Sequence, residues 1–284
     1  MTSTTKLSAT ERFGQIVTGP DEKIRLAEAA LLIACDEYHD LDIGAYLARI
    51  DAMADAFRRR LWRDISPADT ILRLNRFLFD EQGFAGNADD YHDPRNSYLN
   101  EVLDRRLGIP ITLGLVYMEI GRCIGLPVQG VSFPAHFLVK YRMREGTVVL
   151  DPYAKGVSLS FDDLRHRVRS LHNGVAPTKS RVAAMLGAAS NREILVRMLR
   201  NLKNIYINDG QWPKALAVSD RIIAIMPDDA IEHRDRGMIY VGLECFRAAL
   251  ADFQSYLGRS PEAEDAGVVR QYVIDLQTAA ARLN

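Results

Sequence analysis

Apolar residues recur every three or four positions in the first part of the chain, a spacing that predicts amphipathic helices. Residues 22–63 are predicted to form two helices, whose apolar faces carry Ile24, Ala27, Leu31 and Ala34, then Ile43, Tyr46, Leu47, Ile50, Met53 and Phe57. A third helix is predicted to begin after Ser66, because serine is a favourable N-cap and Pro67 suits the first helical position. Residues 21–94 are therefore a predicted helical N-terminal region. Residues 1–20 are rich in Ser and Thr and weakly patterned, so we expect a flexible tail there.

The apolar pattern changes from helical to alternating beyond Gly125. Before that point, helices are predicted around residues 97–107 and from Pro110 to Cys123. Beyond it, residues 136–141 and 147–151 have the composition of strands. We therefore expect a mixed α+β core with a small antiparallel sheet over residues 95–177.

The two predicted strands can be paired by parity, with a turn at Glu145-Gly146 between them. In a hairpin with an even-length loop, an odd-numbered residue on one strand faces an even-numbered residue on the other. Asp151 then projects on the same face as His136. We expect these two side chains to be neighbours.

Residues 190–284 have a helical pattern throughout and contain an internal repeat. The same residue types recur 34 positions apart, as Tyr206 and Tyr240, Ala215 and Ala249, and Pro227 and Pro261. This is the period of the tetratricopeptide repeat, a pair of antiparallel helices. The prediction is two helical hairpins, over residues 196–229 and 230–263, followed by a capping helix from about residue 264.

The composition narrows the class of protein. The 284 residues are 48% hydrophobic and 26% charged, as in an ordinary globular chain. The formal net charge is -1 and neither half is strongly basic, which argues against nucleic-acid binding through phosphate neutralisation. No apolar run is long enough to span a membrane, and the N-terminus lacks the apolar centre of a secretory signal. The three widely spaced cysteines favour a reducing cytoplasm over a disulfide framework.

The densest group of chemically capable residues lies between positions 95 and 155. A glycine turn precedes a helix, a strand carrying His136 follows, and the next strand ends in Asp151. Papain-like and transglutaminase-like cores have this order. In them a cysteine at the N-terminus of the helix is activated by a histidine, which a carboxylate or amide orients.

Long segments of the chain resemble one bacterial family. They are NRFLFDEQGFAGNADDYHD, PRNSYLNEVLDRRLGIPITLGLVYMEIGRCIGLPVQGVSFPAHFLVKY and LDPYAKG, followed by the helical repeats. The chain closely resembles the SirB-one family of transglutaminase-like proteins, from about residue 22 onward. The resemblance implies a helical N-terminal region, a transglutaminase-like core and tetratricopeptide repeats. It implies no particular reaction.

The transglutaminase triad carries over in part. His136 in PAHFLV matches the histidine and Asp151 in VLDP matches the aspartate. Related active cores place the cysteine two residues after the glycine that opens the helix, and after Gly108 that position is Pro110, which has no nucleophile. Cys123 lies thirteen residues further along the same helix, roughly 20 Å away and at the negative end of its dipole.

A hydroxyl group is the other candidate nucleophile. Thr112 lies in the first turn of the helix and could act with His136 and Asp151, or could simply bond a backbone group of that turn. Asn96 and Ser97 could also approach the cleft, or could cap the helix that follows them.

Metal and cofactor sites are not predicted. The histidines other than His136 show no ligand spacing, and the pair of His136 and Asp151 offers only two ligands. The acidic loop around Asp89 and Asp93 lacks the glycine and terminal glutamate of a calcium loop. Phosphate-binding glycine motifs are absent, so we expect no cofactor.

One pair of residues in the repeats suggests peptide binding. Arg200 and Asn204 lie one helical turn apart on the helix expected to line the concave face, and resemble the pair with which some tetratricopeptide domains clamp a peptide carboxylate. The second repeat offers Arg234 and Asp235 instead, and aspartate repels a carboxylate. Docking of this surface on the protein's own core is the alternative.

These observations favour a transglutaminase-like protein without catalytic activity. Its degenerate cleft at Pro110, Thr112, His136 and Asp151 would bind a protein or peptide, and the repeats would supply a second contact surface. The alternative is an active hydrolase or acyltransferase of amide bonds with Thr112 as nucleophile.

Overall fold

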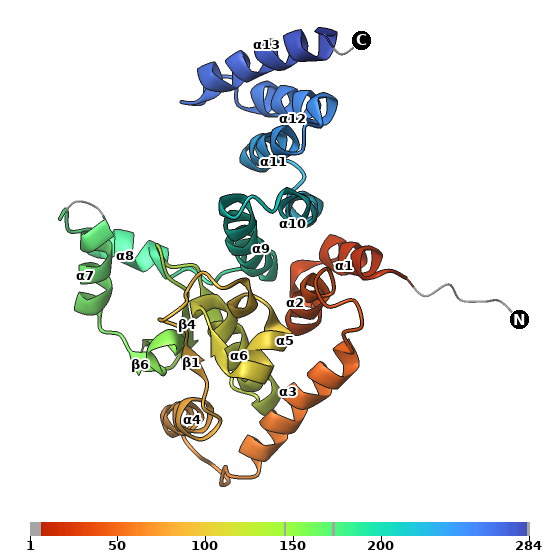
Figure 1. Ribbon diagram of the computed structural model, residues 1–284. Coiled ribbons are helices and arrows are strands. Elements are labelled where there is room, and N and C mark those ends of the chain that lie inside the picture. Colours follow the sequence, from red (N-terminus) through yellow and green to blue (C-terminus); the bar gives the residue numbers. More distant parts are fainter. Residues whose placement is uncertain (1–6, 145, 172–173, 283–284) are drawn as a thin grey trace, which may run out of the picture. The chain divides into compact units, whose positions relative to one another are not determined.

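The computed structural model describes residues 7–144, 146–171 and 174–282, which form two compact units (Figure 1). The first unit, here called the core unit, is Pro20–Met198. The second, called the repeat unit, combines Leu199–Asn284 with Met1–Gly19. The predicted boundary at residue 94 is therefore not a boundary between compact units.

The predicted flexible tail is wrong where the structure describes it. Helix α1 (Ala9–Thr18) begins at Ser8, which forms a capping box with Glu11. Its residues Phe13 and Val17 are buried, and the helix packs against α10 of the repeat unit. Residues 1–6 of that predicted tail lie outside the described residues.

Helices make up most of the core unit. They include α2 (Leu26–Ala34), α3 (Ile43–Arg58), α4 (Pro67–Asn75), α5 (Leu99–Arg105) and α6 (Pro110–Ile124), with short turns η1 (Asp21–Lys23) and η3 (Pro94–Asn96). Every residue of α2 is buried, as its apolar composition on all sides requires. The predicted start of α4 is confirmed, since the Ser66 hydroxyl accepts a hydrogen bond from the N–H of Asp69. The π-helical turn η2 (Arg76–Glu81) continues α4.

A four-stranded antiparallel sheet lies beside these helices, in the order β3 (Gln129–Val131), β4 (Leu138–Arg142), β5 (Thr147–Asp151), β6 (Val157–Ser158). Leu138 packs into a core formed with Leu164 of α7 (Phe161–Leu171) and Val182 of α8 (Lys179–Met185). The opposite face of β4 packs against α6. A short parallel pair, β1 (Ala85–Gly86) and β2 (Leu107–Gly108), precedes α6.

The register of the hairpin agrees with the parity prediction. Val139 pairs with Leu150 and Lys140 with Val149, so Asp151 comes opposite Leu138. His136 itself lies in a turn before β4 rather than within the strand. Glu145, part of the predicted turn, lies outside the described residues.

The close approach of α6 to the sheet gives a first prediction. A Cβ atom added at Gly114 would lie 2.7 Å from the buried ring of Phe137, so Gly114→Ala should cost about 1–3 kcal/mol of unfolding free energy. Gly14 of α1 is the matched control, because nothing lies within 4 Å of its added Cβ. Gly14→Ala should stabilise the protein by roughly 0.5–1 kcal/mol. Urea denaturation of both variants measures the difference, and equal effects would contradict this packing.

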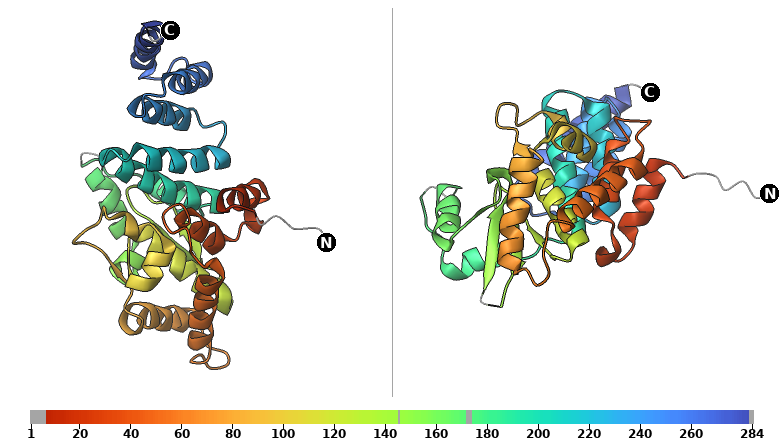
Figure 2. Two further views of the ribbon diagram at one scale, coloured as in Figure 1. Left: turned by 45° about the vertical axis from the view of Figure 1, so that its right-hand side comes forward. Right: turned by 90° about the horizontal axis from the view of Figure 1, so that it is seen from below.

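The repeat unit confirms the predicted period. Its helices after α9 (Asn191–Asn208) are α10 (Trp212–Ile225), α11 (Ala230–Gly242), α12 (Phe246–Arg259) and α13 (Ala266–Arg282). The helices α10 and α12 begin and end 34 residues apart, and α9 and α11 also end 34 residues apart. The two landmark alanines, Ala215 and Ala249, are fully buried. Figure 2 shows α10 to α13 packed in sequence, each on the next.

Candidate functional site

His136 and Asp151 form a hydrogen-bonded pair, as the parity of the hairpin predicts. The Nε2 atom of His136 lies 2.9 Å from Oδ1 of Asp151. Asp151 is the last residue of β5 and caps the short turn η4 (Pro152–Ala154), because Oδ1 also accepts the N–H groups of Tyr153 and Ala154. Its second oxygen, Oδ2, lies 2.8 Å from the guanidinium of Arg167 on α7.

These contacts keep Asp151 ionised. Burial raises the pKa of the carboxyl, but the hydrogen bonds and positive charges of His136 and Arg167 outweigh burial, so the pKa lies below its ordinary value. A carboxylate held this firmly fixes the orientation of the imidazole ring.

The backbone of His136 is also held in place. Arg197, in the part of α9 that belongs to the core unit, donates to the carbonyl of His136 at 2.7 Å and to that of Phe133 at 3.2 Å. The neighbouring Ala135 has a φ of 54°, an uncommon conformation for a residue with a side chain. The hydrogen bonds from Arg197 therefore hold the turn that carries His136 in a backbone conformation that Ala135 would not favour by itself.

Two tyrosines extend the site beyond the histidine. The ring of Tyr153 lies 6.1 Å from His136, and the ring of Tyr91 lies 6.1 Å from Tyr153, both edge-to-face. We call these three residues the aromatic row. Tyr91 is 42% exposed, and His136 remains partly exposed. Tyr153 packs against β1, where an added Cβ at Gly86 would lie 2.4 Å from its ring.

The position of the two tyrosines beside His136 was not predicted from the sequence. Tyr153 follows Asp151 by two residues in the segment LDPY, so its position in the matched motif was an available signal. Tyr91 lies in a loop sixty residues earlier, and no local pattern indicates that this loop reaches the hairpin.

Thr112 occupies a structural position. Its hydroxyl is fully buried, donates to the carbonyl of Asn96 at 2.8 Å and accepts the N–H of Ile109 at 3.1 Å. These bonds join the first turn of α6 to the segment that contains Asn96. In the part of the chain that the structure describes, Thr112 forms no hydrogen bond with His136, so the geometry counts against its predicted role as nucleophile.

The other residues predicted near the cleft are buried as well. The side chain of Asn96 accepts from Asn87 at 3.1 Å and donates to the carbonyl of Asp90 at 2.7 Å, and so holds the loop together. Pro110 is the first residue of α6, and Ser97 is 1% exposed. Direct ligand contact by Asn96, Ser97 or Pro110 therefore requires the loop to open.

Cys123 does not have the properties of a nucleophile. It lies in the last turn of α6, where burial raises the pKa of its thiol and the negative charges of Asp51 and Glu119 add to that effect against Arg122. A thiol with a raised pKa is protonated at neutral pH and is a poor nucleophile.

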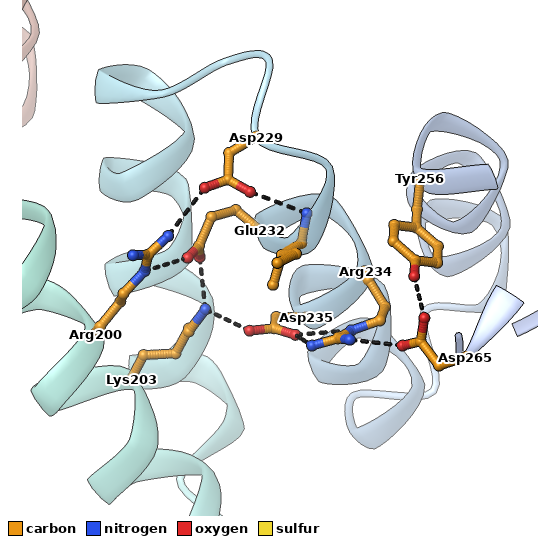
Figure 3. A network of polar contacts seen from close by, with 9 residues as sticks. Arg200, Lys203, Asp229, Glu232, Arg234, Asp235, Tyr256 and Asp265 are labelled. Atoms are coloured by element: carbon orange, nitrogen blue, oxygen red, sulfur yellow. Dashed lines mark hydrogen bonds and ion pairs between the residues drawn. The ribbon is translucent and has the colours of Figure 1, made fainter. Parts of the chain in front are cut away.

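Arg200 is already paired with two carboxylates of the protein. Its guanidinium lies 2.7 Å from Glu232 of α11 and 2.9 Å from Asp229, the N-cap residue of α11 (Figure 3). Asn204, one turn further along α9, is exposed to solvent. The clamp of Arg200 and Asn204 therefore stays a prediction, in which a peptide carboxylate would have to compete with Asp229 and Glu232 for the arginine.

The same carboxylates belong to a longer network of charges, shown in Figure 3. Lys203 contacts Glu232 and Asp235, and both Lys203 and Glu232 are almost completely buried. Arg234 then joins Asp235 to Asp265, which accepts the hydroxyl of Tyr256. The network ties α9, α11 and α12 together.

The structure offers no cluster of metal ligands among its described residues, since no three side chains of His, Cys, Asp or Glu come together to hold an ion there. None of the helices in the described part of the chain is long and apolar enough to cross a membrane.

Comparison with known proteins confirms the predicted resemblance. The family model of the transglutaminase-like superfamily matches residues 44–200, and a tetratricopeptide-repeat model matches residues 202–273. A UPF0162 protein of Xylella fastidiosa (strain Temecula1) is 39% identical over 264 residues, covering 93% of this chain and 94% of that protein. A UPF0162 protein of Pseudomonas aeruginosa is 34% identical over 232 residues, covering 82% and 83%. Protein SirB1 of Salmonella typhimurium is 27% identical over 209 residues, covering 74% and 77%.

Proposed function

Because the chain belongs to the UPF0162 and SirB1 family of transglutaminase-like proteins, we propose that it is a protein-interaction module whose transglutaminase-like site binds without catalysing a reaction. A segment of a partner protein lies against the aromatic row, and the tetratricopeptide repeats provide a second contact surface. The observation that carries the proposal is an oriented histidine to which no thiol or hydroxyl of the described residues hydrogen-bonds.

Acyl transfer needs a nucleophile within hydrogen-bond reach of its base. The Nε2 atom of His136 is occupied by Asp151, so Nδ1 is the nitrogen left to act as a base. Among the described residues, no thiol or hydroxyl hydrogen-bonds to that ring. The helix start where related cores place their cysteine carries Pro110, and the hydroxyl of Thr112 is engaged with backbone groups.

The aromatic row suits recognition of a peptide. Tyrosine rings bury large areas at a low entropic cost and keep a hydroxyl for hydrogen bonding. Tyr91 presents an exposed ring, Tyr153 is buttressed by β1, and His136 is held by Asp151. Such a preorganised surface loses little freedom when a partner binds.

A second candidate function is hydrolysis or acyl transfer on amide bonds. The pairing of His136 with Asp151 favours it, because a carboxylate-oriented imidazole is the usual base of such enzymes. Thr112 would have to leave its two hydrogen bonds before it could act as the nucleophile.

Substitution of Thr112 separates the two functions. Thr112→Val should cost about 1–2 kcal/mol of unfolding free energy, because the Asn96 carbonyl loses its buried donor, and should leave partner binding unchanged. Thr278→Val is the control, since that exposed hydroxyl bonds only within its own helix and its loss should barely change stability. Loss of a catalysed reaction with unchanged stability would instead support Thr112 as the nucleophile.

Affinity capture with mass spectrometry tests the proposal directly. The baits are wild type, Tyr91→Ala, His136→Ala and, as control, Leu72→Ala, which removes an exposed apolar side chain from α4. A partner that is retained by wild type and Leu72→Ala, lost from the other two variants and recovered unmodified supports a binding module. A partner that wild type cleaves or modifies, and that accumulates intact on His136→Ala, overturns it.

A further inference from the structure

A separate pocket lies within the core unit and includes no residue of the aromatic row. It has a volume of about 430 Å³ and lies between residues 22–28, α3 and the second half of α6. This volume falls in the range of small-molecule sites. Apolar side chains form much of its wall, among them Ile24, Leu47, Ile50 and Met118.

Two buried carboxylates line this pocket from different helices. Glu28 comes from α2 and Glu119 from α6, and their side chains are 4% and 8% exposed. A buried carboxylate is costly unless a positive charge or hydrogen-bond donors compensate it. Both groups therefore need positive charges or hydrogen-bond donors beside them.

One arginine at the protein surface pairs with each carboxylate. Arg25 lies 2.8 Å from Glu28, and Arg122 lies 2.9 Å from Glu119, each three residues from its carboxylate in the sequence. Both arginine side chains are 69% exposed, so each guanidinium reaches the carboxylate from solvent at the end of a flexible chain. Ion pairs with such exposed arginines are readily exchanged.

The charge of the lining also favours a cation. Glu22, Glu28, Asp51 and Glu119 give four negative charges, whereas Lys23, Arg25 and Arg122 give three positive ones. Of the two ion pairs that line the pocket, the acidic side chains are buried, and Arg25 and Arg122 lie toward solvent. No trio of metal ligands occurs here among the described residues, which leaves an organic cation.

We propose that this pocket binds a small aliphatic amine or diamine. An ammonium group takes the place of a guanidinium at Glu28 or Glu119, and the hydrocarbon chain lies along Leu47, Ile50 and Met118. The proposal does not depend on the function of the aromatic row, because the two sites share no residue.

Calorimetric titration of the full chain with 1,4-diaminobutane tests the proposal, with 1,4-butanediol as the uncharged probe of similar length. Wild type should bind the diamine and not the diol. Glu28→Gln and Glu119→Gln should each weaken diamine binding about tenfold or more, because a charged hydrogen bond is lost. Glu264→Gln, which removes one exposed negative charge of the repeat unit, should bind as wild type does.

A second variant covers the case in which the buried glutamates are needed for folding. Leu47→Trp fills part of the pocket with a larger side chain and leaves every charge in place. It should abolish diamine binding while the chain retains its thermal unfolding temperature. The proposal is overturned if wild type shows no binding at millimolar diamine, if the diol binds equally well, or if Leu47→Trp binds as wild type does.

Discussion

Removal of Glu232 should destabilise the repeat unit more than any other single truncation in its charge network. Glu232→Ala leaves Lys203 buried beside one remaining carboxylate, that of Asp235, and leaves Arg200 with Asp229 alone. Breaking a buried ion pair in this way costs about 3–5 kcal/mol. Urea denaturation, monitored by the fluorescence of Trp212, measures the effect. Trp62, the other tryptophan of the chain, is replaced by phenylalanine in all variants.

Two further variants make this prediction specific. Asp228→Ala removes an almost fully exposed carboxylate that lies 3.6 Å from Arg259, and should change stability little. Lys203→Met combined with Glu232→Leu removes both buried charges, and should recover most of the stability lost in Glu232→Ala. If the double variant is as unstable as Glu232→Ala, the unpaired charge of Lys203 is not the cause of the lost stability.

Loss of the carboxylate at Asp151 should be the largest effect in the core unit. Asp151→Ala leaves Arg167, His136 and the two N–H groups of η4 without their acceptor, and should cost about 3–5 kcal/mol at neutral pH. Asp163→Ala is the control, because that carboxylate caps α7 from an exposed position. Circular dichroism during urea denaturation measures both variants.

The effect of Asp151 should also depend on pH in a defined direction. The pKa of its carboxyl is lower in the folded protein than the ordinary value of 3.8, so the carboxylate stabilises the fold above that value. This contribution is lost as the pH falls through the lowered pKa. The difference between wild type and Asp151→Ala should therefore be full at pH 6 to 7 and should narrow below about pH 4. A difference that stays constant down to pH 2 would show that the ionised form is not what stabilises the fold.

Helix capping, repeat spacing and strand alternation are set by residues close together in the sequence, and the features that depend on them were predicted. Ser66 and Pro67 mark the start of α4 through backbone capping, and the 34-residue period appears in the helix ends, which recur at that spacing from one hairpin to the next. The alternation of side chains along a strand correctly placed Asp151 opposite Leu138, and His136 reaches Asp151 from the turn just before β4.

The failures concern partners that are distant in the sequence. Helix α1 has one local signal, the capping box of Ser8 and Glu11, but the helix that covers its apolar face, α10, lies far along the chain. The ion pair of Arg200 was not predicted, because Glu232 lies thirty-two residues further on, where no spacing rule connects the two. Thr112 has the right residue type near a matched motif, but the carbonyl that holds it comes from another segment, at Asn96.

The position of α1 has a consequence for the order in which the protein is assembled during synthesis. The helix is made first, but α10, against which Phe13 and Val17 are buried, follows about 190 residues later, after the whole core unit. Contacts that close so long a stretch of chain form late. A nascent chain therefore exposes these two side chains until α10 has left the ribosome, and premature termination within the core unit leaves them exposed permanently. Such unburied apolar surface is what chaperones and proteases recognise, so the exposure of α1 distinguishes chains that end before α10 from chains that extend past it.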